Sequence, residues 1–560
     1  MPDTVRQLAD EFWEAQLEAS PTYATFIGDH RYDDRIEDIS AEAEARWRAR
    51  WSSLRDRIEA VDRAALEPAD QVTAGLLDAE LSRLIDHIDH RIVEQAWDQM
   101  VGVHTDLLLV IPQLNAPEPD QTTKLVERFR QVPTLLRQAV ERFRMAVSEG
   151  RTPPRVAIDR SLNMIDGYLA SPIESDPIVT LSGPAGWDGE EAWRAELAEV
   201  VRDAVRPAFA DYRAVLASEL GPVVRPDDQP GVQWIPGGPE QYRMLALHHT
   251  SLDLPPDEVH RIGLAELTEK LPAEYADVGG RLFGTTERAE IFERLRNDPA
   301  LRYETGDEII ADARRCLDAA RAEMGQWFGR LPQADCDLKA VPEYAAPDSP
   351  AAYYFPPADD GSRPGAYYVN THEPSTRLRY ETAAIAYHEA IPGHHLQLAI
   401  ATELQGVPTF QRLSMGHTAY AEGWGLYAER VADEMGLYTT DLDRLGLLSA
   451  DSLRSARLVV DTGLHAMGWT RQQAIDFMVE YVPSSVEEVT VEVDRFIVWP
   501  GQALAYKIGQ REIFRLREDA KQRLGDRFDI RGFHDTVLGS SLVTLPILGD
   551  LVDGWVVSRT

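Results

Sequence analysis

The most informative segment of the chain reads YETAAIAYHEAIPGHHLQLAI and spans residues 380–400. Its apolar residues favour a buried helix. Yet it holds three of the 14 histidines of the 560-residue chain, His388, His394 and His395, together with Glu389. Burying several imidazoles and a carboxylate without partners is costly. A divalent cation would be a partner for all of them, so the segment predicts a metal site.

The spacing of the histidines requires a deformed helix. Zinc hydrolases commonly carry His-Glu-x-x-His, in which two histidines one turn apart bind zinc and the glutamate is the general base. Here Pro392 stands at the position of the second histidine. In a straight helix His388 and His394 point apart, and His395 lies about 10 Å from His388 along the axis. Pro392 and Gly393 favour a break in the helix, which could bring His394 beside His388.

A later helical segment, AYAEGWGLYAE at residues 419–429, offers the carboxylate that would complete the site. Glu422 and Glu429 are seven residues apart, so both can face one side of a helix. Small residues, Ala421 and Gly423, flank Glu422 and permit close approach of another helix. Glu422 is therefore the predicted third ligand. Glu429 is expected to orient a ligand histidine, because metal-bound imidazoles usually donate their second ring N–H to such a group.

Helical periodicity dominates the first 330 residues and resumes at Ser375. Between these regions, Ala352–Phe355 and Ala366–Val369 are rich in tyrosine and are predicted to be two short strands. Turn-forming residues in the segment Pro356–Pro364 separate them. The prediction is a mainly α protein with a small β-sheet next to the metal-binding helix.

The character of the sequence changes near residue 335, which divides the chain into two predicted lobes. Residues 1–335 are expected to form a helical N-terminal lobe, and residues 336–560 a catalytic lobe with the sheet and the metal-binding helices. Within the sheet, Tyr367–Asn370 is a candidate edge strand that pairs with an extended substrate. An ordinary buried strand is the alternative.

Composition excludes several classes of partner. The formal net charge is −36, so nucleic acid and anionic membrane surfaces would be repelled. No apolar run reaches the length of about 18 residues that a membrane span needs. The N-terminal residues lack the basic start and apolar core of a signal peptide, and two cysteines cannot form a disulfide framework. A cytoplasmic location is expected. The acidic charge favours solubility in a crowded or salty cytoplasm, and attraction of cationic substrates is the alternative.

Three motifs carry a resemblance to a known family. HEAIPGHHLQ at residues 388–397, YAEGWGLYAE at 420–429 and WPGQALAYKIG at 499–509 resemble a widespread bacterial family known as a domain of unknown function. SPTYATFIGD at residues 20–29 belongs to the same pattern, so the resemblance covers nearly the whole chain.

That family distantly resembles the Taq-type zinc metallocarboxypeptidases, which are helical, cleft-shaped gluzincins. The resemblance implies one continuous domain with a cleft, one zinc ion per chain and a possible homodimer. It also implies that His388, His394 and Glu422 bind zinc and that Glu389 is the base. The Gly-His pair that ends the shorter motif of that group matches Gly393-His394, which favours His394 over His395. The two extra residues between the histidines depart from the group's pattern.

The expected chemistry is hydrolysis of an amide bond. Zinc would lower the pKa of a bound water, and Glu389 would accept its proton and pass it to the leaving amine. Tyr506 is the candidate donor to the developing oxyanion, and Arg495 the candidate that grips a substrate carboxylate. Both have structural alternatives, since Tyr506 can be a core tyrosine and Arg495 can pair with Glu492 or Asp494.

The leading hypothesis is a zinc metallopeptidase, carboxypeptidase-like, that acts on a peptide. A zinc amidase that acts on a small non-peptide amide is a second hypothesis. The third is a helical binding protein without catalysis. A closed four-ligand site that includes His395 would favour the binding protein, because structural zinc leaves no open position. Glu389 argues against it, because a structural site needs no base.

Overall fold

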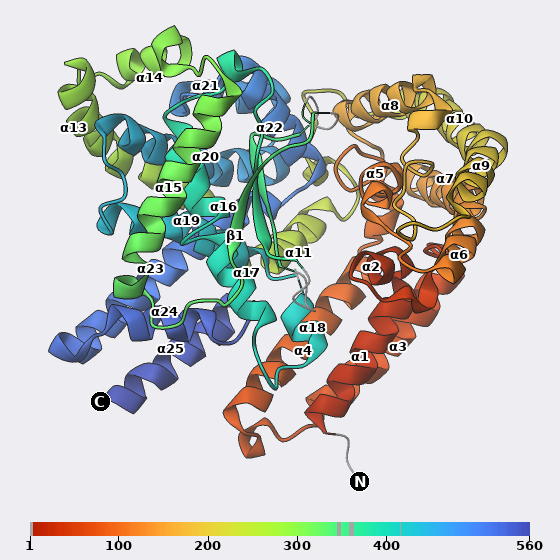
Figure 1. The fold of residues 1–560 in the computed structure, drawn as a ribbon, viewed down its shortest axis with the longest axis horizontal. Coiled ribbons are helices and arrows are strands. Elements are labelled where there is room, and N and C mark those ends of the chain that lie inside the picture. Colours follow the sequence, from red (N-terminus) through yellow and green to blue (C-terminus); the bar gives the residue numbers. More distant parts are fainter. Residues whose placement is uncertain (1–3, 344–345, 347–348, 358–362, 415) are drawn as a thin grey trace.

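Helices build almost all of the molecule (Figure 1), with 71% of the chain helical and 4% in strands. This confirms the prediction of a mainly α protein with a small sheet. The structure is a computed structural model that describes residues 4–343, 346, 349–357, 363–414 and 416–560. Among these residues, no helix combines the length and the apolarity needed to cross a membrane.

The N-terminal helices form the right-hand part of the view in Figure 1. They are α1 (Val5–Ala19), α2 (Pro21–Phe26), α3 (Ala41–Glu59), α4 (Pro68–Asp89), α5 (Val103–Leu109), α6 (Pro119–Phe129), α7 (Val132–Ser148), α8 (Arg155–Ala170), α9 (Glu190–Val200) and α10 (Arg206–Val215). Five helices continue the chain towards the sheet: α11 (Gly238–Thr250), α12 (Pro256–Ala265), α13 (Leu271–Phe283), α14 (Arg288–Asn297) and α15 (Gly306–Trp327).

The helices that follow the sheet lie on the left and in the centre of the same view. They are α16 (Glu381–Glu389), α17 (His394–Thr402), α18 (Thr409–Leu413), α19 (Thr418–Glu434), α20 (Asp441–Ala466), α21 (Arg471–Tyr481), α22 (Val486–Val498), α23 (Ala505–Leu524), α24 (Ile530–Leu538) and α25 (Leu545–Arg559). Local signals set several of their starts. Thr440 and Thr470 open α20 and α21 with capping boxes, which satisfy backbone N–H groups that the helix itself leaves free.

Three strands form the sheet in the order β1 (Cys336–Ala340), β3 (Gly365–Val369), β2 (Ala352–Phe355). β1 runs parallel to β3, and β2 antiparallel to it. β2 and β3 were predicted, whereas β1 was missed because its sequence, CDLKA, has no run of β-branched or aromatic residues. Of the predicted turn between β2 and β3, residues 358–362 lie outside the described residues.

The prediction that Tyr367–Asn370 is an edge strand is wrong. β3 pairs with β1 on one side and with β2 on the other, so its backbone groups are already used. β1 and β2 are the edges of the sheet. Helix α17 packs against both β2 and β3, and α16 packs against β2, which places the sheet beside the two helices of the central motif.

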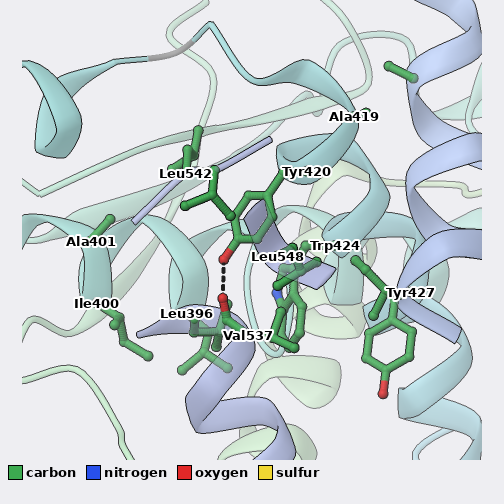
Figure 2. Packing of buried hydrophobic residues seen from close by; sticks show 14 of the residues in the cluster. Leu396, Ile400, Ala401, Ala419, Tyr420, Trp424, Tyr427, Val537, Leu542 and Leu548 are labelled. Carbon is green, nitrogen blue, oxygen red and sulfur yellow. Dashed lines mark hydrogen bonds between the residues drawn. The ribbon is translucent and has the colours of Figure 1, made fainter. Parts of the chain in front are cut away.

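The largest hydrophobic cluster joins the first helices to the last ones. It extends from Val5 of α1 to Val556 of α25, and so contains residues from both predicted lobes. Figure 2 shows its centre, where Tyr420 of α19 lies near Leu396 of α17 and donates a hydrogen bond of 2.6 Å to the carbonyl of Val537. A second cluster lies within residues 97–220, with Val498 at its margin. The division at residue 335 stays a prediction.

Candidate metal centre

The central motif folds as two helices separated by a tight turn. α16 ends at Glu389, α17 begins at His394, and the peptide bond between Ile391 and Pro392 is cis. A Cβ atom at Gly393 would lie 1.9 Å from the carbonyl oxygen of His388, so no larger residue fits there. This turn brings the rings of His388 and His394 to 4.8 Å between centroids. The break expected from Pro392 and Gly393 is therefore present.

Glu422 of α19 meets both of these rings. Its Oε2 lies 3.4 Å from Nε2 of His388 and 3.5 Å from Nε2 of His394. One ligand atom from each of the three residues lies within 4.8 Å of the other two. Within the described part of the chain, no other group of three histidine, cysteine or acidic side chains comes this close. The structure thus brings together the three residues predicted to bind a metal.

Helix α19 also fixes the orientation of His388. Nδ1 of His388 lies 2.8 Å from Oε1 of Glu429, and both side chains are buried. This contact directs Nε2 towards Glu422 and His394. A Cβ at Gly425 would lie only 2.6 Å from Cε1 of His388, so the imidazole packs directly on the helix backbone. Glu429 therefore has the orienting contact expected from the sequence.

The electrostatics of the centre suit a cation. Burial acts to raise the pKa of the Glu422 carboxyl, but its contacts with His388 and His394 outweigh burial and hold that pKa well below the usual range. Burial likewise acts to lower the pKa of His388, but Glu422 and Glu429 raise it to about 10. Positive charge is thus stabilised between the two carboxylates.

The donor set fits zinc. Two imidazole nitrogens and one carboxylate oxygen are the ligands of many catalytic zinc sites, which keep a fourth position open. Nδ1 of His394 is buried and has no hydrogen-bond partner among the described residues. A metal ion at Nε2 would offset part of the cost of burying this imidazole, while Nδ1 stays without a partner among the described residues.

His395 points away from the centre. Its Nδ1 lies 2.9 Å from the hydroxyl of Tyr354 on β2. Burial lowers its pKa to about 4, so the ring is neutral at neutral pH. Of the two candidates for the second ligand, His394 lies at the centre, whereas His395 contacts Tyr354 of the sheet.

Glu389, the predicted base, is the last residue of α16 and is half-buried. Its side chain makes no hydrogen bond or ion pair with any residue that the structure describes. Its negative charge helps to raise the pKa of the neighbouring His388. After burial, it is the largest contribution to the raised pKa of Tyr367 on β3. The Glu389 carboxylate is therefore close enough to act on His388, and it has no hydrogen-bond or ion-pair partner among the described residues.

Tyr506 of α23, the predicted oxyanion donor, lies against the centre. Its ring stacks on that of His388, with centroids 6.5 Å apart and an interplanar angle of 25°. Its hydroxyl accepts a hydrogen bond of 3.5 Å from Nε2 of Gln502. Helices α19 and α23 approach closely because Gly423 and Gly509 face each other, and a Cβ at Gly423 would lie 2.5 Å from the Cα of Gly509.

The turn that leads into α23 is held by a buried carboxylate of α20. Asp461 accepts hydrogen bonds from the backbone N–H of Gly501, at 3.1 Å, and from the hydroxyl of Tyr242, at 2.6 Å. Burial raises the pKa of Asp461 to about 7. Since Tyr506 is the second residue of the helix that follows this turn, Asp461 contributes to its position.

Arg495 has structural partners. It donates hydrogen bonds to Glu492, at 3.4 Å, and to Gln502, at 2.6 Å. Sequence reasoning missed two arginines of α20 that lie beside Tyr506. The guanidinium carbons of Arg454 and Arg457 are 6.0 and 4.6 Å from the ring centroid of Tyr506. The available signal was the presence of two arginines, Arg454 and Arg457, within the long apolar pattern of that helix.

Comparisons with known proteins give a family and a fold. A family model described as "Bacterial protein of unknown function (DUF885)" matches residues 21–552. No curated protein matches the chain. Two solved structures are similar to it over nearly their whole length. The "putative lipoprotein" from Colwellia psychrerythraea is 27% identical, with a TM-score of 0.90 over 99% of this chain and 100% of that one. A "putative lipoprotein of unknown function" from Shewanella oneidensis is 18% identical, with a TM-score of 0.77 over 98% and 99%.

Proposed function

Because the chain belongs to the DUF885 family of bacterial proteins of unknown function, we propose an activity from the site itself: a zinc-dependent hydrolase that cleaves peptide bonds in a carboxypeptidase-like manner. One observation carries the proposal. His388, His394 and Glu422 converge with their ligand atoms within 4.8 Å of one another, and Glu389, whose charge acts on His388, has no hydrogen bond or ion pair with any described residue. A structural metal site has no use for such a carboxylate.

The residues have distinct roles in this proposal. Nε2 of His388, Nε2 of His394 and the carboxylate of Glu422 would hold the ion. Zinc bound there supplies Lewis acidity, which polarises a carbonyl oxygen and makes water nucleophilic near neutral pH. Glu429 keeps His388 in the tautomer that leaves Nε2 free as a ligand.

Two further side chains would handle protons and charge. Glu389 would accept the proton of the attacking water and deliver it to the leaving amine, and no competing partner among the described residues opposes this. Tyr506 would donate a hydrogen bond to the developing oxyanion. Its hydroxyl oxygen accepts from Gln502, so its own proton remains available.

We place the substrate along one face of α16. Glu381, Ile385 and Glu389 are the residues of this helix that are not fully buried, and their spacing of four puts them in one stripe. A cavity of about 70 Å³ is lined by Glu381 and Ile385, and by Tyr367 of β3. The substrate would lie along this face of α16, from the cavity at Glu381 and Ile385 to Glu389.

The two alternative functions differ in what they need. A zinc amidase that acts on a non-peptide amide would use the same residues, so only substrates separate it from a peptidase. A binding protein without catalysis would favour a closed metal site with four protein ligands. The commitment of His395 to Tyr354 leaves three candidate ligands, which supports an enzyme.

The test measures bound metal by elemental analysis in wild type and in the variants His388→Ala, His394→Ala, His395→Ala and Glu422→Ala. We expect about one zinc ion per chain in wild type and in His395→Ala, and loss of zinc in the other three. A panel of peptides and non-peptide amides then follows, with zinc-loaded Glu389→Gln as the inactive control. Absence of any transition metal from wild type, even after reloading, would overturn the proposal in favour of a binding protein.

A further inference from the structure

A cavity of about 510 Å³ lies beside the segment at residues 20–29, in the N-terminal part of the chain. That segment carries part of the family resemblance, yet the proposed hydrolysis makes no use of it. Helices α2 and α5 contribute to the lining, and both lie in the right-hand part of the view in Figure 1. Among the described residues that line the cavity, none belongs to the candidate metal centre. Its volume is within the range of roughly 300–1,000 Å³ that is usual for sites of small organic ligands.

Apolar side chains supply most of the lining, and several of them are accessible. Phe26 of α2 is 42% exposed, and Val101, just before α5, is 39% exposed. Ile39 and Val103 also line the cavity and are half-buried. An apolar ligand would remove this surface from water, which strengthens binding by about fourfold for each methylene group of the ligand that becomes buried.

The charged side chains of the lining are acidic. Glu37 and Asp106 are the charged residues among the described residues that line the cavity, and none of the others is a lysine, arginine or histidine. Glu37 already has partners, because its carboxylate accepts hydrogen bonds from the backbone N–H and the hydroxyl of Thr22, both at 2.8 Å. The carboxylate of Asp106 on α5 has no hydrogen bond or ion pair with any described residue, and Asp106 is accessible to solvent.

The surroundings of Asp106 are negative. Burial, together with the charges of Glu37 and Asp98, raises the pKa of Asp106 to about 6. Arg128 acts on Glu37, but its Nη2 donates hydrogen bonds to nearby backbone carbonyls. No cationic side chain of the described residues offsets the charge of Asp106. Above about pH 6 the cavity therefore holds a carboxylate whose charge the protein itself does not neutralise.

The wall formed by residues 20–29 is held in place by hydrogen bonds. The hydroxyl of Thr25 donates a hydrogen bond of 2.6 Å to Asp33 and accepts one of 2.8 Å from Arg128. The hydroxyl of Tyr23 donates a hydrogen bond of 3.0 Å to the carbonyl of Leu413, which ties this wall to α18. A ligand would therefore meet a preformed surface, and little affinity would be lost in ordering it.

We propose that this cavity binds an organic ammonium ion with an apolar body, in which the ammonium group meets Asp106 and the apolar body packs against Phe26 and Val101. An ammonium N–H and a carboxylate form a charge-assisted hydrogen bond, which is the stronger kind. The net charge of −36 favours the approach of a cation. A small alkylamine and the free amino end of an apolar peptide share this chemistry. The proposal does not depend on the hydrolase, because the cavity and the metal centre share no residue.

The test measures binding by calorimetry at pH 8 on the full-length Glu389→Gln protein, in which the proposed hydrolysis is disabled. Octylammonium, octan-1-ol and octanoate have the same apolar chain and differ in charge. We expect octylammonium to bind about 10- to 100-fold more tightly than the other two. Butylammonium should bind more weakly, by about fourfold for each methylene group removed. Leu-Phe-amide and acetyl-Leu-Phe-amide test the amino end of a peptide in the same way.

Two variants in the same background separate the charge from the apolar wall. Asp106→Asn should abolish the preference for the cation, and Phe26→Ala should weaken binding of every eight-carbon probe by about 3- to 10-fold. Asp203→Asn is the matched control, because Asp203 is an exposed aspartate outside the lining, and it should keep the full preference. Thermal unfolding establishes that each variant is folded. The three eight-carbon probes on the parent protein decide the matter if Asp106→Asn does not fold.

Equal binding of the three eight-carbon probes, or a preference for the cation that survives Asp106→Asn, would overturn the inference. Failure of both octylammonium and Leu-Phe-amide to bind would do the same. Tight binding of octylammonium that depends on Asp106 supports a site for small amines. Tight binding of Leu-Phe-amide alone, lost on acetylation and in Asp106→Asn, supports the same site and assigns it to the amino end of a peptide.

Discussion

The substitution Gly425→Ala tests the position of His388 most directly. The new Cβ would lie 2.6 Å from Cε1 and 2.8 Å from Nε2 of the imidazole. Carbon atoms in contact are separated by about 3.5 Å, so the ring would have to move by roughly 1 Å. Its hydrogen bond to Glu429 and its burial oppose that movement.

The expected loss of zinc affinity is at least about 10- to 100-fold. Zinc tolerates deviations of only about 0.2 Å in ligand distance, so a displacement of about 1 Å would remove Nε2 of His388 as an effective ligand. Loss of a group that orients a ligand has an effect of about this size. Overpacking would also lower the free energy of unfolding by about 1–3 kcal/mol.

The assay is competition for zinc against a chromophoric chelator, with stability followed by urea unfolding. Gly554→Ala in α25 is the matched control, because a Cβ there meets no atom within 4 Å. It should keep its zinc affinity and gain about 0.5–1 kcal/mol in stability, since alanine is the better helix former. If the folded Gly425→Ala protein binds zinc within about twofold of wild type, the placement of His388 as a ligand is refuted.

Three further predictions follow from the buried groups. Glu429→Gln should lower zinc affinity by about 10- to 100-fold, measured by the same competition, because the amide cannot orient His388 as a carboxylate does. Asp461 has a pKa of about 7 in the folded protein, far above its unfolded value, so the folded state retains a proton that the unfolded state releases. The free energy of unfolding should fall as pH rises from about 4 to 7, and Asp461→Asn should remove up to roughly 4 kcal/mol of that fall in urea unfolding at several pH values. Burial lowers the pKa of His534 to about 3, so the unfolded state binds the proton first on acidification. Lowering the pH from about 7 to 5 should cost about 2 kcal/mol through this residue, and His534→Gln should show a correspondingly flatter stability profile.

Features that depend on neighbours in the chain were readable from the sequence. The helix break at Pro392 and Gly393 follows from the missing backbone donor of proline and the small size of glycine, both local properties. The strands Ala352–Phe355 and Gly365–Val369 have a composition typical of strands, and the structure has them with one residue added. Strand β1 was not predicted, because its own residues do not favour a strand and only its pairing with β3 makes it one.

The choice between His394 and His395 shows where local reasoning ends. The spacing of the two residues from His388 excludes neither once the helix is broken. The contact between the Tyr354 hydroxyl and Nδ1 of His395 distinguishes the two histidines, because it holds His395 beside the sheet. That contact exists because β2 packs on α17. Gly423, by contrast, was identified from its size alone as a point of close helix approach.

The residue types and their spacing along the chain determined the helical class, the position of the helix break and the identity of the candidate metal ligands. Only the tertiary structure decided which of those side chains meet. Tyr506 is far from Arg457 and His388 in the sequence, and its contacts with both depend on how α16, α20 and α23 pack. The reason is physical: dihedral preferences and periodicity act over a few residues, whereas distances between side chains of different helices depend on the packing of the whole core.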